Sequence, residues 1–262
     1  MDFQVDGEQV HAATGSRPLE RAEPAIILIH GAGMDRTVWQ LQTRNIAYQG
    51  RQVYAVDLPG HGRSAGAALT SIEAMADWLD RFMAAAGLKT ATVIGHSMGA
   101  LVAIAFAARY PARMDNLCLM GIAETMPVHP DLLSAAKNNE ALAADLIVFW
   151  GVGEKAQTGG HPHPGLWVQG ASRTLLGLSR SDVLYVDLVA CNAYAGVLAA
   201  AQKVQCPTRF ILGRDDKMTP AARARSLGAA IGQSETTVID SCGHMMMLEC
   251  PNQVHAALVG IV

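Results

Sequence analysis

The sequence predicts an α/β fold in which a mostly parallel, doubly wound sheet carries helices on both faces. Short apolar runs rich in β-branched residues, such as AIILI at 25–29, recur along the chain, as expected for strands buried on both faces. Helical patterns lie between these runs, and such alternation is typical of parallel sheets. Hydrophobic residues make up 50% of the 262 residues and charged residues 16%, which favours one large core and excludes intrinsic disorder.

The expected elements follow one another from the first residues to the last. A β-hairpin of strands 3–5 and 9–13 comes first, because the two runs flank Asp6-Gly7, a strong turn signal. The other expected strands are 25–29, 52–56, 91–94, 116–120, 208–212 and 236–239, and the expected helices are 71–86, 98–109, 221–231 and 253–259.

One interval, Ile122–Ala200, interrupts the alternation and is too long for a loop in a compact domain. Helical patterns cover 131–150 and 181–201, while 151–165, with its five glycines and two prolines, is predicted to be a mobile loop. In the first pattern, the stripe expected to face inward is Leu133, Ala136, Leu142, Leu146 and Phe149. We interpret 122–200 as a helical cap inserted into a core of residues 1–121 and 201–262. The alternative is a set of extra helices packed on the sheet without a gating role.

Composition restricts the partners and the compartment. The net charge is −3 and no basic block is present, so neither nucleic acid nor a membrane surface is an expected partner. The longest apolar stretch, Ala100–Ala108, is shorter than the roughly 20 residues of a membrane-spanning helix. Five cysteines without CxxC spacing and a mixed, polar N-terminus favour the reducing cytoplasm. A homo-oligomer is left open.

The segment Gly95–Gly99, GHSMG, fits the motif G-x-S-x-G and lies between a predicted strand and a predicted helix. A serine on such a sharp turn has a strained backbone, and the two glycines leave room for the chains that crowd it. The helix N-terminus then directs free N–H groups towards developing negative charge. Ser97 is therefore the expected nucleophile.

A second loop, His30-Gly31-Ala32-Gly33, follows the strand at 25–29. Small residues at the end of a strand let the backbone N–H groups turn inward. The N–H groups of Ala32 and Met98 are the predicted oxyanion-hole donors. His30 is interpreted as a brace for the loop rather than a proton-transfer group.

Five segments, in this order, resemble those of the α/β-hydrolase superfamily along nearly the whole chain: HGAGMDRTVW (30–39), DLPGHGRS (57–64), GHSMG (95–99), GRDDKMTP (213–220) and CGHMMMLECP (242–251). The resemblance implies a triad in the order Ser, Asp or Glu, His. His244, which follows the last expected strand, matches the base. The frame of Gly213 and Pro220 selects Asp216 over Asp215 as the acid.

The loop 57–64 resembles a structural loop of the superfamily. Its residues Asp57, His61 and Arg63 are accordingly assigned to structure rather than to catalysis.

Together these residues imply a serine hydrolase that cleaves a small to medium, largely apolar carboxylic ester or lactone through an acyl-enzyme, with no metal or organic cofactor. One alternative is a hydrolase of carbon–carbon bonds in ring-fission products, which often has an aromatic residue after the histidine where this chain has Met245. The other alternative is a small-molecule receptor that retains the triad and turns over slowly.

The side chains expected to contact the small-molecule substrate are mostly apolar: Met34, Trp39, Phe149, Trp150, Trp167, Met218 and Met245. The run Met245–Met247 either lines a soft acyl pocket or packs in the core. The segment HPHP at 161–164 is interpreted as part of the mobile loop, because no carboxylate or third histidine completes a metal site.

Overall fold

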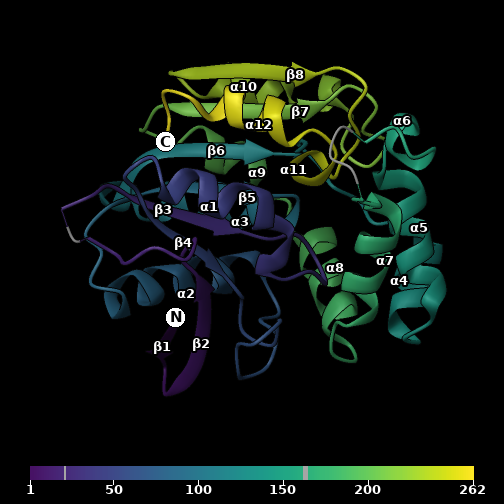
Figure 1. Ribbon diagram of the computed structural model, residues 1–262, viewed down its shortest axis with the longest axis horizontal. Helices are drawn as coiled ribbons and strands as arrows, with labels where there is room; N and C mark the ends of the chain where they lie inside the picture. The colour runs from purple at the N-terminus through teal and green to yellow at the C-terminus, as the bar shows by residue number, and fades with distance from the viewer. Residues whose placement is uncertain (21, 162–164) are drawn as a thin grey trace.

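A mixed sheet of eight strands runs through the molecule in the order β1-β2-β4-β3-β5-β6-β7-β8 (Figure 1). The structure, a computed structural model, describes residues 1–20, 22–161 and 165–262. The strands are β1 (Asp2–Val5), β2 (Glu8–Ala13), β3 (Ala25–Ile29), β4 (Gln52–Val56), β5 (Ala91–His96), β6 (Met114–Met120), β7 (Thr208–Gly213) and β8 (Ser234–Ile239). β2 pairs antiparallel with β1 and β4, and every other neighbouring pair is parallel, which confirms the predicted fold class.

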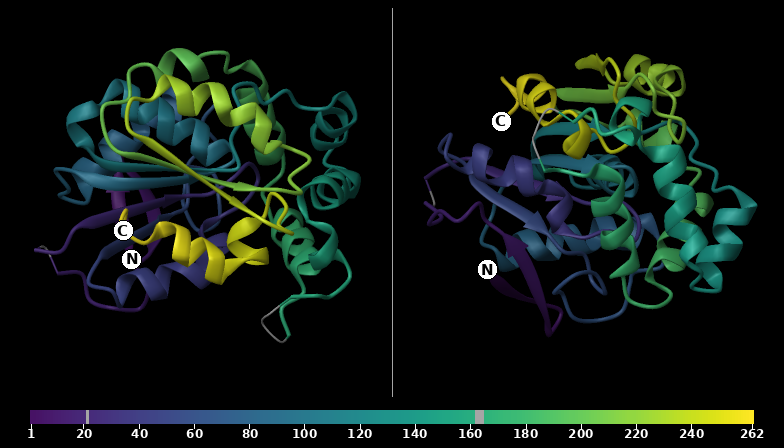
Figure 2. Two further views of the ribbon diagram at one scale, coloured as in Figure 1. Left: turned by 90° about the horizontal axis from the view of Figure 1, so that it is seen from above. Right: turned by 45° about the vertical axis from the view of Figure 1, so that its right-hand side comes forward.

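Helices cover both faces of the sheet (Figure 2). On one face lie α1 (Gln40–Ala47), α11 (Met246–Glu249) and α12 (Pro251–Leu258), and on the other α2 (Ile72–Ala85), α3 (Met98–Arg109), α9 (Val197–Ala201) and α10 (Arg225–Ala230). Single 3₁₀ turns occupy Arg36–Trp39, Pro111–Arg113 and Ala221–Ala224. Successive residues of β3 alternate between the two cores: Ile27 and Ile29 pack with α2 and α3, whereas Ile26 and Leu28 pack with α1 and α12.

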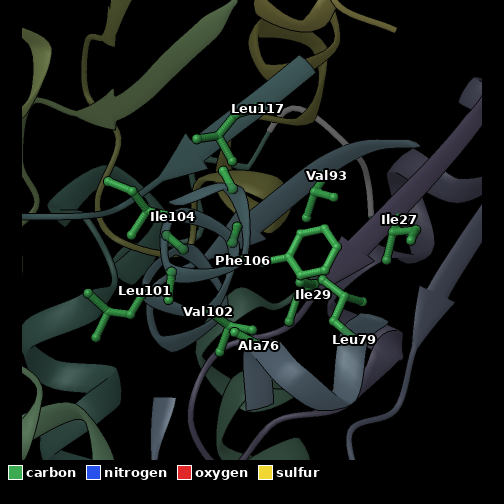
Figure 3. Close-up of a cluster of buried hydrophobic side chains, with 14 of the residues drawn as sticks. Ile27, Ile29, Ala76, Leu79, Val93, Leu101, Val102, Ile104, Phe106 and Leu117 are labelled. Carbon is green, nitrogen blue, oxygen red and sulfur yellow. The ribbon is translucent and has the colours of Figure 1, made fainter. Parts of the chain in front are cut away.

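Helix α3 lies at the centre of the larger core and is buried on all sides. Every residue from Met98 to Ala107 is buried, because α3 packs between the sheet, α2 and α9. The side chain of Phe106 projects into a group of aliphatic side chains that includes Ile27, Leu79 and Val93 (Figure 3). Although α3 is apolar throughout, none of the described helices is long and apolar enough to cross a membrane.

Between β6 and β7 the described residues form six helices, in the interval that the sequence predicts to be helical. They are α4 (Pro130–Lys137), α5 (Ala141–Gly151), α6 (Glu154–Gln157), α7 (Val168–Gly177), α8 (Val183–Ala193) and α9. Helices α4–α8 gather beyond the carboxyl ends of the parallel strands (Figure 1), whereas α9 packs against α3 and α10. We call α4–α8 the inserted helices.

The expected single helix at 131–150 is wrong, because the chain breaks between α4 and α5. Asn139 takes a left-handed φ of 53°, and its amide exchanges two hydrogen bonds with Asp182. The break changes the phase of the helix that follows, so the expected inward stripe is wrong at Leu142 and Phe149, whereas Leu146 still packs against the core. Leu142 and Phe149 are 48% and 62% exposed, and Ile147 faces the interior instead.

Other local expectations also need correction. The predicted loop at 151–165 contains the end of α5 and the whole of α6, while Pro162, His163 and Pro164 lie outside the described residues. The pattern at 181–201 forms two helices, α8 and α9, rather than one. Helices α1, α7 and α11 were not expected, and α1 (QLQTRNIA) shows why: its sequence is largely polar, so it carries little of the apolar pattern on which sequence-based assignment depends.

Two phenylalanine-to-alanine substitutions test this packing. Phe106 is 0% exposed, so Phe106→Ala should lower the free energy of unfolding by about 3–5 kcal/mol. Phe149→Ala removes an exposed ring and should change it by no more than about 0.5 kcal/mol. Urea unfolding followed by circular dichroism measures both, and equal losses would contradict the assignment of Phe149 to the surface.

Candidate active site

Ser97 lies on the tight turn between β5 and α3, with φ of 56° and ψ of −117°. A side chain rarely adopts this backbone conformation, which is therefore a site of strain. The neighbouring glycines make the turn possible. A Cβ at Gly95 would lie 2.0 Å from the Gly99 carbonyl oxygen, and one at Gly99 would lie 2.3 Å from the Ile29 carbonyl oxygen. This crowding is the steric requirement that the motif predicts.

His244 and Asp216 come together from the ends of two neighbouring strands. His244 follows β8, Asp216 follows β7, and Nδ1 of His244 lies 2.7 Å from Oδ2 of Asp216. The Asp216 carboxylate also accepts the backbone N–H groups of Met218 and Thr219 at 2.9 and 2.8 Å, and the Thr219 hydroxyl at 2.7 Å. The neighbouring Asp215 is partly exposed, whereas Asp216 is buried. The structure thus pairs His244 with Asp216, the carboxylate that the sequence frame selects.

The surroundings of Asp216 keep it ionised. Burial acts to raise the pKa of Asp216, but His244 and the hydrogen bonds from Thr219 outweigh it and lower this pKa to about 2. A charged carboxylate at this position holds a proton on Nδ1 of His244. Nε2 of the neutral ring is then an acceptor, and within the described residues it is buried without a hydrogen-bond partner.

The loop that carries His244 is fixed by backbone groups and by Glu249. The N–H of His244 donates to the Gly151 carbonyl at 2.6 Å. Glu249, only 4% exposed, accepts the N–H groups of Gly153, Gly243 and Met245 at 2.9–3.0 Å. Burial raises the pKa of Glu249. Sequence reasoning missed this residue, although it stands within the segment CGHMMMLECP.

Two further histidines beside the site have structural partners. Nε2 of His96 donates to the His244 carbonyl at 2.8 Å, and burial together with His244 lowers the pKa of His96 to about 3. His30 donates from Nδ1 to the Gly31 carbonyl at 2.9 Å and accepts the Leu58 N–H at Nε2. Burial, with His61 nearby, lowers the pKa of His30 to about 4, so both rings are neutral near pH 7. His30 holds the loop it belongs to, as the sequence predicts.

A cavity of about 290 Å³ contains Ser97 and His244 in its lining. Most of the other lining side chains are apolar and come from Ala32, Met34, the segment 126–128, Leu132, Ile147, Trp150, Leu188, Cys191 and Met218. Polar side chains are His129, Lys217, Thr219 and Arg223. The segment 126–129 and Leu188 carry no motif, so sequence reasoning could not identify them.

Only some of the side chains that the sequence predicts to contact the substrate line this cavity. Met34, Trp150 and Met218 line it. Trp39 and Met245 are 0% exposed in the core, which resolves the methionine run in favour of core packing. Phe149 and Trp167 are each 62% exposed and do not line the cavity. The sequence periodicity identified apolar positions but not the face of the inserted helices on which each one lies.

Both segments expected to form the oxyanion hole lie beside Ser97. Ala32 lines the cavity, and a Cβ at Gly31 would come within 3.3 Å of the Ser97 Cβ. Met98 is the first residue of α3, so its N–H has no acceptor one turn earlier in the helix. In the described part of the chain, no group of three or more His, Cys, Asp or Glu side chains is arranged to hold a metal ion.

Known proteins resemble this chain along most of its length. The model of the alpha/beta hydrolase family matches residues 26–257. The chain is 27% identical over 248 residues to the putative carbamate hydrolase RutD of Escherichia coli O103:H2, covering 90% of each protein. One other curated relative, 30% identical over 146 residues, is matched along only 30% of its own length.

Solved structures give a similar result. A thermophilic esterase, 28% identical, superposes with a TM-score of 0.80 over 98% of this chain and 94% of its own. The enol-lactonase from Burkholderia xenovorans LB400 superposes with a TM-score of 0.87 over 98% of each chain at 22% identity, a likeness of fold.

The lowered pKa of Asp216 predicts a pH dependence of stability. A carboxyl whose pKa falls on folding stabilises the folded state above its ordinary pKa of 3.8, and this contribution is lost as the pH falls through about 2. The stability gap between wild type and Asp216→Asn should therefore narrow by about 2 kcal/mol between pH 5 and pH 2. Urea unfolding at each pH measures it. A gap that stays constant over this pH range would contradict the assigned charge of Asp216.

Proposed function

Because the chain belongs to the α/β-hydrolase family, we propose that it is a serine hydrolase that cleaves a small to medium, largely apolar carboxylic ester or lactone through an acyl-enzyme. The supporting observation is the 2.7 Å contact between His244 and Asp216, which leaves Nε2 of His244 unpartnered, among the described residues, at a cavity that Ser97 also lines. A base with a free Nε2 that lines the same cavity as a strained serine can accept the serine proton once the two side chains approach to hydrogen-bond distance.

In this mechanism Ser97 Oγ attacks the acyl carbonyl while Nε2 of His244 takes its proton. The N–H groups of Ala32 and Met98 stabilise the resulting oxyanion. His244 then protonates the departing alcohol oxygen, which leaves an acyl group on Ser97. Water, deprotonated by His244, attacks this acyl group and releases the carboxylic acid. Asp216 holds the ring and stabilises the imidazolium in both halves of the reaction.

The substrate class is inferred from the cavity. Its lining is predominantly apolar, and its volume of about 290 Å³ lies near the lower end of ligand-binding pockets. The likeness to a thermophilic esterase at 28% identity agrees with ester cleavage. A lactone presents the same carbonyl to Ser97 and yields a hydroxy acid.

The inserted helices are proposed to act as a cap that selects the substrate. Leu132 of α4, Ile147 and Trp150 of α5, and Leu188 of α8 all line the cavity. These helices lie beyond the carboxyl ends of the strands, where α/β folds bind ligands, and on this proposal their side chains contact the acyl chain.

The proposal is tested first at Ser97. Ser97→Ala should reduce kcat for p-nitrophenyl butyrate by about 10⁴–10⁶-fold while the fold is retained. The wild type should turn over the ester repeatedly. A fluorophosphonate probe should label the wild type and should not label the variant. Equal labelling of both proteins would overturn the assignment, and a single slow covalent event without turnover would favour the receptor.

Two neighbouring carboxylates provide a matched pair of variants. Asp216→Asn should lower kcat by about 10⁴-fold, because an amide favours the wrong tautomer of His244. Asp215→Asn makes the same chemical change one residue earlier and should retain nearly full activity. Steady-state kinetics on one ester measure both, and the reverse order of activities would show that Asp216 does not orient His244.

Two tryptophans test the cap. Trp150 lines the cavity, so Trp150→Ala should shift the preference in kcat/KM towards longer acyl chains by about tenfold. Trp167→Ala removes an indole that is 62% exposed and should leave the preference unchanged. A series of p-nitrophenyl esters from acetate to decanoate measures it. Identical profiles for the two variants would show that α5 does not select the substrate.

A further inference from the structure

A buried carboxylate on the inserted helices reaches the loops beside Ser97. Asp187, on α8, is 0% exposed, and its Oδ2 accepts the backbone N–H of Gly33 at 2.8 Å. The same oxygen lies 2.8 Å from Nε2 of His61, in the loop after β4. One carboxylate oxygen therefore joins α8 to two loops of the core.

His61 is arranged to be an imidazolium. Its Nε2 faces Asp187, and its Nδ1 lies 3.0 Å from the Pro59 carbonyl oxygen, so both nitrogens face acceptors. Burial acts to lower the pKa of His61, but Asp187 and the Pro59 carbonyl outweigh it and raise this pKa above its ordinary value. The centroid of the neutral His30 ring lies 4.7 Å from the centroid of the His61 ring. Asp187 and His61 thus form a buried ion pair between an inserted helix and the core.

The loop that Asp187 contacts carries an expected oxyanion donor. The Gly31 carbonyl accepts hydrogen bonds from His30 Nδ1 at 2.9 Å and from the Met34 N–H at 3.2 Å. This carbonyl shares its peptide unit with the N–H of Ala32. Because the trans peptide is planar, these bonds also fix the Ala32 N–H, which points the opposite way from the carbonyl.

Gly33 completes the turn and is held by α8. Its φ is +66°, and a Cβ there would lie 2.7 Å from Leu184 Cδ1. Helix α8 therefore packs directly on this residue while Asp187 binds its N–H. Without that acceptor, the Gly33 N–H would be a buried donor lacking a partner, which costs free energy. The turn would then be more stable after rotating so that this N–H reaches another acceptor.

A contribution to stability does not by itself explain this ion pair. Oδ1 of Asp187 is buried and has no hydrogen-bond partner in the part of the chain that the structure describes. Burying a charge with an unsatisfied oxygen is costly, and apolar replacements of such pairs are often neutral or stabilising. A positioning role explains a carboxylate here better than stability does.

From this arrangement we infer that Asp187 is a positioning residue for the hydrolysis proposed above. Its carboxylate holds the Gly31–Gly33 turn through the Gly33 N–H, so that the Ala32 N–H faces the oxyanion only while α8 is docked. The inference rests on the proposed function, since the Ala32 N–H serves catalysis only if Ser97 forms a tetrahedral intermediate.

Three variants test the inference: Asp187→Leu, which removes the acceptor, Asp187→Asn, which keeps an acceptor oxygen, and Asp182→Asn. Asp182 is an exposed acid at the start of the same helix, and Asn there keeps the side-chain oxygen that accepts from the Asn139 amide, so its variant is a matched control for the charge of α8. The assays are kcat and KM for p-nitrophenyl butyrate, and the inhibition constant of a boronic acid whose tetrahedral adduct on Ser97 places an oxygen in the oxyanion hole.

Asp187→Leu should lower kcat by about 100-fold with KM nearly unchanged, since a misplaced donor weakens only the transition state. Boronic acid affinity should fall in step with kcat. Asp187→Asn should lose less, about three- to tenfold, because its amide oxygen still accepts the Gly33 N–H. Asp182→Asn should match the wild type. If Asp187→Leu fails to fold, Asp187→Asn is compared with Asp182→Asn. A lower kcat and a weaker boronic acid affinity for Asp187→Asn support the inference, and equal values contradict it.

Two outcomes would overturn the inference and are distinguishable. If the wild type neither hydrolyses esters nor reacts with a fluorophosphonate at Ser97, the proposed function fails and the inference fails with it. If the wild type is active and the Asp187 variants change only the melting temperature, or change KM rather than kcat and boronic acid affinity, Asp187 merely attaches α8 to the core.

Discussion

The strained turn at Ser97 constrains the geometry around it. Its backbone can fold back only because Gly95 lies against the Gly99 carbonyl and Gly99 lies against the Ile29 carbonyl. The second contact requires β3 to lie directly beside β5, which the parallel pairing of the two strands provides. The loop after β3 consequently starts next to the serine, and Ala32 reaches the same cavity. A local steric requirement thus links the turn at Ser97 to the neighbouring strands β3 and β5.

Charge is concentrated at the same edge of the sheet. Among the buried carboxylates of the described residues, Asp216, Glu249 and Asp187 each bind a loop at this edge, through His244, through three backbone N–H groups, and through Gly33 with His61. Backbone N–H groups and imidazoles satisfy most of their oxygens, as burial of charge demands. The loop that carries His244 and the loop that carries Gly33 also bind the inserted helices, because the Gly151 carbonyl accepts the His244 N–H and Asp187 accepts the Gly33 N–H.

Much of the sheet and of the candidate triad could be predicted from the sequence. Strands such as AIILI bury both faces, so their composition alone identifies them, and GHSMG carries its own steric requirement. Residues that act through tertiary contacts left no such signal. Asp187 is a single acid in an apolar helix, and only the fold shows that it faces His61. The exposed position of Phe149 depends on a break at Asn139 that helical periodicity does not encode.

Assigning His61 to structure on the sequence alone was therefore incomplete rather than mistaken. The imidazole does hold the loop after β4 through the Pro59 carbonyl, yet its second nitrogen meets a carboxylate supplied by α8. A brace whose partner belongs to the inserted helices couples the core loop to the position of those helices. The same carboxylate oxygen binds the turn beside Ala32, so any displacement of α8 acts on both loops at once. On the proposals made above, α8 both helps to cover the cavity and holds the turn beside Ala32.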